Sequence, residues 1–256
     1  MTESNANPTS AMLPAIRPLP TAMNLVIHQH VLLDPDSGIW QRERQNVGFY
    51  KDRIVPHLVY WTMRNQQLRP YRERVVSAAS GRVLEIGIGS GLNLDFYPQR
   101  VQQILGLDPS LRLLQMARQA VNQSLNQSRL NVTLLEASAE AIPLEDNSTD
   151  TVVMTWTLCS IPDPVRALSE IRRVLHPNGQ LLFVEHGLAP EDKVRRWQNR
   201  LTPIWKRLAG GCHLNRPVRE LIENAGFAIT QIEAGYMAGP KLMTFLSEGR
   251  AKPVTS

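Results

Sequence analysis

"VLEIGIGSGLNL", residues 83–94, places three glycines within five positions behind a short apolar run that contains Glu85. The apolar run predicts a buried strand, and a glycine-rich turn after such a strand is typical of nucleotide-binding folds. Gly87, Gly89 and Gly91 read GxGxG. The dinucleotide fingerprint GxGxxG needs its last glycine one position further on, where this chain has a leucine, so the turn disfavours NAD and FAD. No Gly-Lys-Ser or Gly-Lys-Thr follows, which excludes a phosphate-binding loop.

Apolar runs and helical patterns alternate downstream of this turn. The runs typical of buried parallel strands are RVLEIG, QILGLD, VTLLEA, DTVVMTW and GQLLFVEH. Helical patterns lie between them at 111–125 and 164–179, and the second starts with proline and stops at an Asn-Gly pair. Two last strands are predicted at 228–236 and 241–251. This order predicts an α/β fold with an open parallel sheet and helices on both faces.

Composition narrows the class of protein. The 256 residues allow one large α/β domain with appendages, and the net charge is only +5. The basic excess gathers at 64–74 and 193–207, which we interpret as solvated helix faces, and nucleic-acid binding is not expected. No apolar stretch approaches the roughly 20 residues of a membrane span, and no secretory signal is visible, so we expect a cytoplasmic protein.

The chain divides into an arm and a domain. Residues 1–45 contain five prolines among scattered Ser, Thr and Asn, so we expect a lid or a contact between copies of the chain in a homo-oligomer. Residues 46–256 are the predicted catalytic domain, with 188–215 inserted as a helical cap. The two cysteines, Cys159 and Cys212, form no CxxC pair and no disulfide framework, so no metal site is expected.

Two acids indicate which ligand the turn holds. Glu85 would repel a pyrophosphate on the following helix N-terminus and would favour a ligand that carries an ammonium group. S-adenosylmethionine (SAM) carries an ammonium, a carboxylate and a sulfonium at one end. Asp108 ends the next strand, 21 residues after Gly87 (108 − 87), where an acid can accept hydrogen bonds from ribose hydroxyls. The alternative for Asp108 is a cap of the helix at 111–125.

Several segments resemble a known family. VLEIGIGSG, LGLDPS, EASAEAIPLEDNSTDTVV and RRVLHPNGQLLFVEH resemble, in this order, the class I SAM-dependent methyltransferases. LNLDFYP, WTLCSIPDP, LLFVEHGLAP, RRWQNRLTPIWKRLAGGCHLNR and ELIENAGF extend the match to about residues 47–250 and resemble the methyltransferase-like alkyl-thiol methyltransferases and their bacterial relatives. The resemblance implies a Rossmann-like, seven-stranded, mostly parallel sheet with helical caps. Animal members start with a hydrophobic membrane anchor, whereas residues 1–45 here are polar and proline-rich, so we do not expect a membrane location.

The resemblance also implies a set of cofactor-binding residues. They are Glu85, Gly87, Gly89, Gly91, Asn93, Asp108, Pro109, Ser138, Ala139 and Thr155. Within this set, the glycines line the methionine part of SAM, Asp108 holds the ribose and Thr155 lies near the sulfonium. Ser138 stands where relatives often have an adenine-binding aspartate, so its contact is a departure from the family pattern.

The acceptor side is predicted from residues that follow the fourth and fifth strands and from the cap, because substrates bind outside the carboxyl ends of such strands. The candidate catalytic residues are His186, Glu185 and Cys159, and the candidate substrate contacts are Trp156, Trp205, Cys212 and His213. Core packing is the alternative for the tryptophans and cysteines.

The sequence leaves several acceptors open. The favoured one is a small thiol or a similar sulfur or selenium nucleophile, which needs no strong base because a thiol is partly ionised at neutral pH. A quinone-type ring carbon and a lipid amine are the alternative acceptors. A SAM-binding protein without turnover is the alternative outside enzymes.

Overall fold

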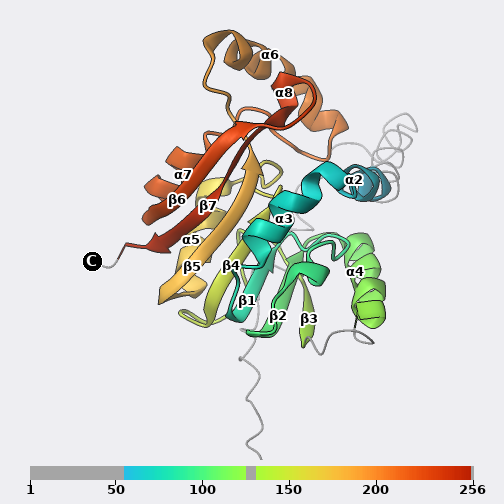
Figure 1. The fold of residues 1–256 in the computed structure, drawn as a ribbon, viewed down its shortest axis with the longest axis vertical. Helices are drawn as coiled ribbons and strands as arrows, with labels where there is room; N and C mark the ends of the chain where they lie inside the picture. Colours follow the sequence, from blue (N-terminus) through green and yellow to red (C-terminus); the bar gives the residue numbers. More distant parts are fainter. Residues whose placement is uncertain (1–54, 125–130, 255–256) are drawn as a thin grey trace, which may run out of the picture.

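The computed structural model describes residues 55–124 and 131–254, which form a seven-stranded sheet covered by helices (Figure 1). The strand order is β3-β2-β1-β4-β5-β7-β6. The first five strands are parallel, and β7 runs antiparallel to both of its neighbours. The strands are β1 (Gly81–Ile86), β2 (Val101–Asp108), β3 (Val132–Glu136), β4 (Thr149–Thr155), β5 (Leu175–His186), β6 (Phe227–Tyr236) and β7 (Phe245–Pro253). The predicted Rossmann-like, mostly parallel sheet is confirmed.

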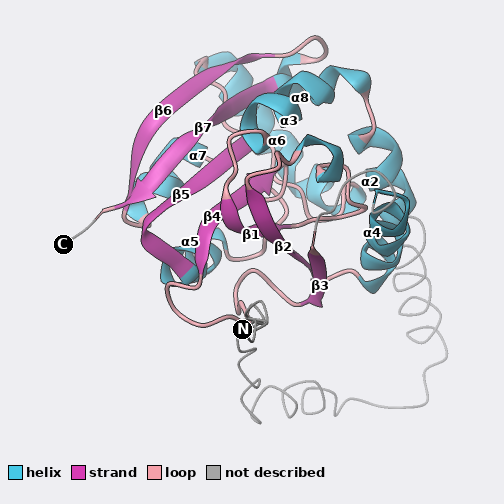
Figure 2. Cartoon of the chain, turned by 60° about the horizontal axis from the view of Figure 1, so that its bottom comes forward, coloured by secondary structure: helices cyan, strands magenta, loops and turns pink. Residues whose placement is uncertain are grey.

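Helices cover both faces of the sheet (Figure 2). The helices are α2 (Val55–Met63), η3 (Gln66–Leu68), α3 (Arg69–Val76), η4 (Leu94–Phe96), α4 (Leu111–Ser124), α5 (Pro164–Val174), α6 (Asp192–Leu208), α7 (Val218–Asn224) and α8 (Lys241–Thr244). One apolar cluster joins α5 and α7 to the sheet, and a second joins α3 and α4 to the opposite face. Leu84 belongs to the first cluster and Val83 to the second, because successive strand residues point to opposite faces. Burial on both faces explains why β1 reads as a continuous apolar run.

The boundary between α5 and β5 differs from the prediction. The helix predicted at 164–179 ends at Val174, and Leu175 already has extended backbone angles (φ −78°, ψ 131°). A proline at position 177 disfavours helical geometry for the residue before it, so the strand begins ahead of the Asn-Gly pair. The start of α5 agrees with its sequence signals, since the Asp163 side chain accepts a hydrogen bond from the Arg166 amide.

The last predicted strand also begins later than expected. Residues 241–244 form the short helix α8, and β7 starts at Phe245. The carbonyl oxygen of Pro240 accepts hydrogen bonds from the Met243 amide and the Thr244 hydroxyl, which closes one helical turn. The strand prediction at 241–251 is therefore wrong for its first four residues.

The strand order creates one crevice. β1 lies between β2 and β4, so the connections that leave the sheet on either side of β1 run in opposite directions. In open α/β sheets, ligands bind outside the carboxyl ends of the strands at this reversal. The glycine-rich turn after β1 therefore lies at the expected position for a ligand.

Two expectations concern parts outside the sheet. No helix within 55–124 and 131–254 is long and apolar enough to cross a membrane. The arm predicted at 1–45 lies outside the described residues, so its role as a lid or as a contact between copies stays a prediction.

Two glycines in the β6–β7 hairpin give a matched test of this packing. A Cβ atom at Gly249 would lie 2.2 Å from the Gln231 carbonyl oxygen and 3.0 Å from the Phe183 ring, whereas a Cβ atom at Gly235 would meet nothing within 4 Å. Gly249→Ala should lower the free energy of unfolding by about 1–3 kcal/mol through overpacking. Gly235→Ala should change it by less than about 0.5 kcal/mol. Urea unfolding of both variants measures the difference, and equal effects would contradict the close approach of β6 to β7.

Candidate active site

A cavity of about 320 Å³ lies at the carboxyl ends of the parallel strands. Segments after β1, β2, β3 and β4 line it, and so do residues of α2, α3 and the segment after α6. The predicted site residues that line it are Gly87, Gly89, Asp108, Pro109, Ser138, Ala139, Thr155 and Trp156. Eight residues that are far apart in the sequence thus come together around one space.

The three glycines of the turn do two different jobs. Gly87 and Gly89 line the cavity with φ of +66° and +57°, a backbone conformation that side chains disfavour. Gly91 does not line the cavity. A Cβ atom there would lie 2.9 Å from the Leu94 side chain and 3.3 Å from Ala120 of α4, so this glycine lets the turn pack against the helix.

Asp108 ties the turn after β1 to the turn after β2. Its Oδ2 accepts a hydrogen bond from the Gly89 amide at 3.0 Å, and its Oδ1 accepts one from the Ser110 amide at 2.8 Å. Burial raises the pKa of Asp108 above its ordinary value, against the lowering effect of these two amides. The helix cap is a separate group, because the Ser110 hydroxyl accepts the Leu113 amide. Each carboxylate oxygen retains a lone pair that can accept from a ligand.

Glu85 lies behind the cavity wall rather than in it. Its Oε1 accepts from Asn93 Nδ2 and its Oε2 accepts from the Tyr97 hydroxyl, both at 2.8 Å. Asn93 Oδ1 in turn accepts from Arg72 Nη1 at 2.7 Å, and Asn93 does not line the cavity either. Burial raises the pKa of Glu85 to about 7, although the two hydrogen bonds and the Arg72 charge lower it. Glu85 is therefore connected to the cavity indirectly, by hydrogen bonds through Asn93 to Arg72.

Arg72 is a site residue that the sequence analysis missed. Its interpretation as part of a solvated face is wrong, because Arg72 is only 6% exposed and lines the cavity. The guanidinium carbon lies 4.8 Å from the centre of the Trp156 ring, and Nη1 lies 3.4 Å from Thr155 Oγ1. Burial lowers the pKa of Arg72 to about 10, and Glu85 raises it. Helical spacing could have indicated that Arg72 is buried, because residues three and four positions apart share a helix face and Val75 and Val76 are buried.

Trp156 has an unusual backbone. Its φ is +51°, which is rare for a large side chain and is stabilised by the hydrogen bond from its amide to the Val184 carbonyl at 2.8 Å. This conformation directs the chain sharply away from β4. Trp156 and Thr157 both line the cavity, so the turn forms part of its wall.

Six of the predicted acceptor-side residues do not line the cavity. They are Cys159, Glu185, His186, Trp205, Cys212 and His213. Their neighbours Ser160, Ile161 and Gly210 do line it. Trp205 is half-buried on α6, whereas Trp197 is 48% exposed, so these two tryptophans do not form a joint core contact.

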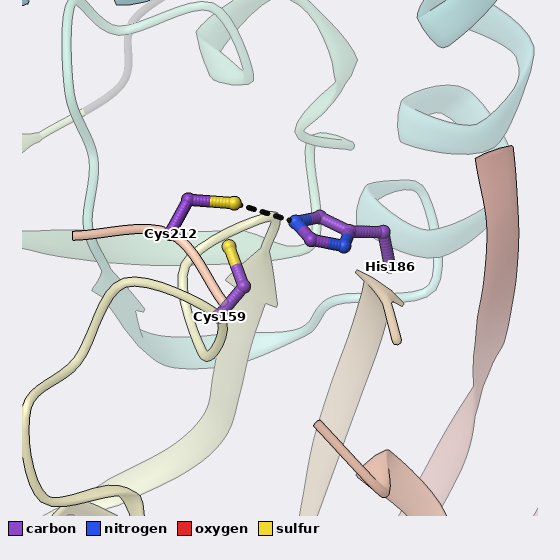
Figure 3. Close-up of side chains that lie close together, drawn as sticks. All are labelled: Cys159, His186 and Cys212. Carbon is purple, nitrogen blue, oxygen red and sulfur yellow. Dashed lines mark hydrogen bonds between the residues drawn. The ribbon is translucent and has the colours of Figure 1, made fainter. Parts of the chain in front are cut away.

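Cys159, His186 and Cys212 form a compact cluster (Figure 3). His186 Nε2 lies 3.0 Å from Cys212 Sγ, and the two sulfurs and a ring nitrogen of His186 all lie within 4.8 Å of one another. A hydrogen bond with Cys159, together with burial, raises the pKa of the Cys212 thiol well above its ordinary range. Burial lowers the pKa of His186, but its contacts with Cys212 and the charge of Glu185 together raise it above its ordinary value.

Glu185 positions the turn that carries Cys159. Glu185 is fully buried, and its Oε1 accepts hydrogen bonds from the amides of Thr157 at 2.8 Å and Leu158 at 3.0 Å. Burial raises the pKa of Glu185 to about 7, and these amides lower it. His213 binds the same turn from the other side, since its amide donates to the Cys159 carbonyl at 2.9 Å. These contacts favour a positioning role for both residues over a direct catalytic one.

Comparisons with known proteins identify the family of this chain. The family model described as "Methyltransferase domain" matches residues 84–183. The chain is 31% identical over 227 residues to thiol S-methyltransferase TMT1B of Rattus norvegicus, covering 87% of this chain and 90% of that protein. It is 36% identical over 112 residues to phosphatidylethanolamine N-methyltransferase of Cereibacter sphaeroides, covering 43% of this chain and 53% of that protein. A SAM-dependent methyltransferase structure from Aquifex aeolicus has the same fold, with a TM-score of 0.55 at 19% identity over 78% of this chain and 98% of that one.

The sheet order, the glycine-rich turn and these relatives define the class. The chain belongs to the class I SAM-dependent methyltransferases, and it transfers a methyl group from SAM to a small-molecule acceptor. Within that class it is a homologue of the thiol S-methyltransferases, as the rat relative indicates.

Asp108 provides a test of cofactor binding. Asp108→Ala should weaken SAM binding at least about tenfold, because hydrogen bonds to a charged group contribute roughly 1.5–3 kcal/mol each. Calorimetric titration measures the affinity, and circular dichroism checks that the variant is folded. The exposed Glu220→Ala serves as the matched control. If Asp108→Ala binds SAM with wild-type affinity, Asp108 does not contact SAM and only connects the turns after β1 and β2.

The raised pKa of Glu85 should make the stability of the protein depend on pH. Its pKa is raised from 4.5 to about 7 in the folded protein, so its contribution is fully present below pH 4.5 and is lost as the pH rises through about 7. Between pH 5 and 8, the wild type should lose roughly 2–3 kcal/mol more stability than Glu85→Gln. Urea unfolding at both pH values measures this, with Glu220→Gln as the control. If Glu85→Gln and the wild type lose the same free energy of unfolding between pH 5 and 8, folding does not raise the pKa of Glu85.

Proposed function

We propose that this methyltransferase acts on a small thiol and that the acceptor sulfur receives the methyl group. The observation that carries the proposal is the length of the alignment with the rat thiol S-methyltransferase. The family model ends at residue 183, whereas the alignment with the rat protein spans 227 residues and covers 87% of this chain. The alignment must therefore include part of the segment after residue 183. That segment contains the end of β5, α6 and the loop with Cys212, and two residues of that loop, Ala209 and Gly210, line the cavity.

The cavity suits SAM in size and in charge. Its volume lies within the range of about 300–1,000 Å³ that small-molecule sites occupy. Among the described residues that line it, Arg72 is the only lysine or arginine and Asp108 is the only acid. Arg72 would hold the carboxylate of SAM and Asp108 its ribose hydroxyls, while Gly87 and Gly89 allow the backbone to approach. Ser138 and Ala139 would border the adenine.

The work left to the protein is alignment and the exclusion of water. When bound, SAM supplies a methyl group on a positively charged sulfur that is already a good leaving group. Thr155 and Trp156 follow β4 and would fix the position of that end, with Arg72 stacked on the Trp156 ring. Apolar side chains of Met63, Ile161 and Pro162 line the same cavity and limit the access of water.

The lining favours an acceptor that needs no strong base. No histidine, glutamate or lysine is among the described residues that line the cavity, and both Asp108 oxygens already accept backbone amides. A thiol with a reference pKa of about 8.5 is partly ionised at neutral pH and can attack without such a base. A phenol or a ring carbon would have to be deprotonated first.

A lipid amine is the second candidate acceptor. The observation that favours it is the similarity to the phosphatidylethanolamine N-methyltransferase, which spans about half of that protein. The cytoplasmic location, the absence of nucleic-acid binding and the homo-oligomer expected from the sequence stay predictions.

Turnover on matched acceptors tests the proposal. The formation of S-adenosylhomocysteine should be measured with an alkyl thiol, the alcohol and the amine of the same chain length, a quinol and a phosphatidylethanolamine. We expect turnover with the thiol at least about a hundredfold above that with the alcohol, because the alcohol is scarcely ionised at neutral pH. Asp108→Ala, assayed below its own SAM saturation, should lower the rate with every acceptor.

Three outcomes would contradict the proposal. Turnover confined to the quinol would assign a ring-carbon acceptor, and turnover confined to the lipid would assign the amine. Binding of SAM without turnover on any acceptor would support a binding protein.

A further inference from the structure

The Cys159–His186–Cys212 cluster has no role in the site described so far. Its three side chains come from the turn after β4, the end of β5 and the loop after α6. Figure 3 shows the Cys212 sulfur directed at Nε2 of the imidazole, with the Cys159 sulfur beside it on the same side of the ring. Two thiols and one imidazole within 4.8 Å of each other are unusual in a chain that has only two cysteines in total.

The backbone around the cluster is well fixed. The His213 amide donates to the Cys159 carbonyl, so the two cysteine segments are tied directly to one another. The Cys212 amide donates to the Ala209 carbonyl, which closes the turn after α6. Glu185 holds the amides of Thr157 and Leu158 on the other side. The three side chains are therefore presented by rigid segments, as a preformed ligand set requires.

The geometry is close to that of a tetrahedral metal site. Zinc–sulfur bonds of about 2.3 Å and zinc–nitrogen bonds of about 2.0–2.1 Å place the ligand atoms about 3.6–3.8 Å apart. Here His186 Nε2 lies 3.0 Å from Cys212 Sγ, and no pair of the three ligand atoms is more than 4.8 Å apart. Side-chain rotations that move these atoms by about 1 Å would complete the arrangement.

We propose that Cys159, His186 and Cys212 bind one zinc-class ion, and that its fourth coordination position receives the sulfur of the acceptor. Thiolate and imidazole ligands select soft or borderline cations such as Zn²⁺ over Mg²⁺ and Ca²⁺. Two cysteine thiolates would also neutralise the charge of the ion in this partly buried place. Cys₂His with one open position is a ligand set that catalytic zinc sites use. The proposal replaces the expectation of a metal-free protein.

The cluster lies beside the part of the cavity assigned to the acceptor. Cys159 Sγ is 3.5 Å from the hydroxyl of Ser160, which lines the cavity, and Gly210, two residues before Cys212, lines it as well. The role of the open position rests on the proposed thiol function, whereas the metal site itself does not.

The reaction at this site balances without another reactant. On binding the ion, both cysteines would release their protons to solvent, and the acceptor thiol would also release its proton to solvent when its sulfur takes the fourth position. The sulfur then forms a bond to the methyl carbon of SAM. The bond from that carbon to the sulfonium breaks, and its electron pair stays on the sulfur of S-adenosylhomocysteine. Coordination keeps the acceptor ionised at a pH where a free thiol is mostly protonated.

Metal titration of the reduced full-length protein tests the site. After removal of metal with a chelator, the protein should bind one Zn²⁺ per chain in competition with a chromogenic chelator. Co²⁺ should give the intense charge-transfer absorption of cobalt–thiolate bonds. Cys159→Ser, Cys212→Ser and His186→Asn should each weaken Zn²⁺ binding by more than about 100-fold, since even outer-sphere partners typically cost 10- to 100-fold. His176→Asn changes an exposed histidine of β5 and should bind Zn²⁺ like the wild type.

Several results would overturn the metal site. They are the lack of one-to-one binding by the wild type, a cobalt spectrum without thiolate absorption, and unchanged binding in the three variants. A Cys159–Cys212 disulfide that persists under reducing conditions would also overturn it. The cobalt spectrum is measured on the wild type, so the test does not depend on the folding of any variant.

The rate of thiol methylation tests the fourth position. The zinc-loaded enzyme should methylate the alkyl thiol at least about tenfold faster than the metal-free enzyme, while calorimetry gives the same SAM affinity for both. Equal rates would overturn the placement of the acceptor on the ion. If neither form methylates the thiol, the proposed function fails, and the titration still decides the metal site.

Discussion

The hydrogen bond from the Gly89 amide to Asp108 connects the ends of two neighbouring strands, and the geometry of the cavity depends on it. The turn that carries this amide has glycines with positive φ at positions 87 and 89, and it lies against the end of β2. The same carboxylate holds the Ser110 amide and so fixes where α4 begins. One buried acid thereby aligns the glycine turn, the second strand and the following helix.

A second buried acid supports the opposite wall. Glu85 is fully enclosed, yet it links the Tyr97 hydroxyl to Asn93, and Asn93 to Arg72. Burying a charge is costly unless it is paired or hydrogen-bonded, and here both oxygens of Glu85 accept a hydrogen bond and Arg72 donates to Asn93. The arrangement leaves the guanidinium facing the cavity, where it lies over the Trp156 ring. The Arg72 side chain is therefore positioned both by its hydrogen bond to Asn93 and by its contact with the Trp156 ring.

The sequence was most informative where local rules act. Apolar runs predicted every strand of the sheet, and in β1, β4 and β5 the central residues are buried on both faces. Element ends were less predictable, as the early start of β5 at Leu175 shows, since a proline two residues later outweighs the Asn-Gly signal. Glycines and acids next to a strand located the cavity.

The sequence could not predict contacts between residues that are far apart in the chain. Arg72 reaches Thr155 across 83 residues, and only tertiary packing brings these two side chains together. The sequence assigned Cys159, His186 and Cys212 to the acceptor side, but they lie on three segments with no metal-ligand spacing, so it did not predict a common ligand set. Helical spacing would have found Arg72, because Val75 and Val76 share its face.

The position of β7 has a consequence for how the chain folds during synthesis. β7 follows β6 in the sequence but lies between β5 and β6 in the sheet, and its Leu246 pairs with His186 at the end of β5. While a ribosome is still making the segment before Phe245, β6 has no partner strand and the β5 edge is open. Five parallel strands can assemble at that stage, but the edge next to His186 stays unpaired and prone to association with other chains. Completion of the acceptor side therefore waits for the last strand to emerge, and chaperone demand should be greatest in that interval.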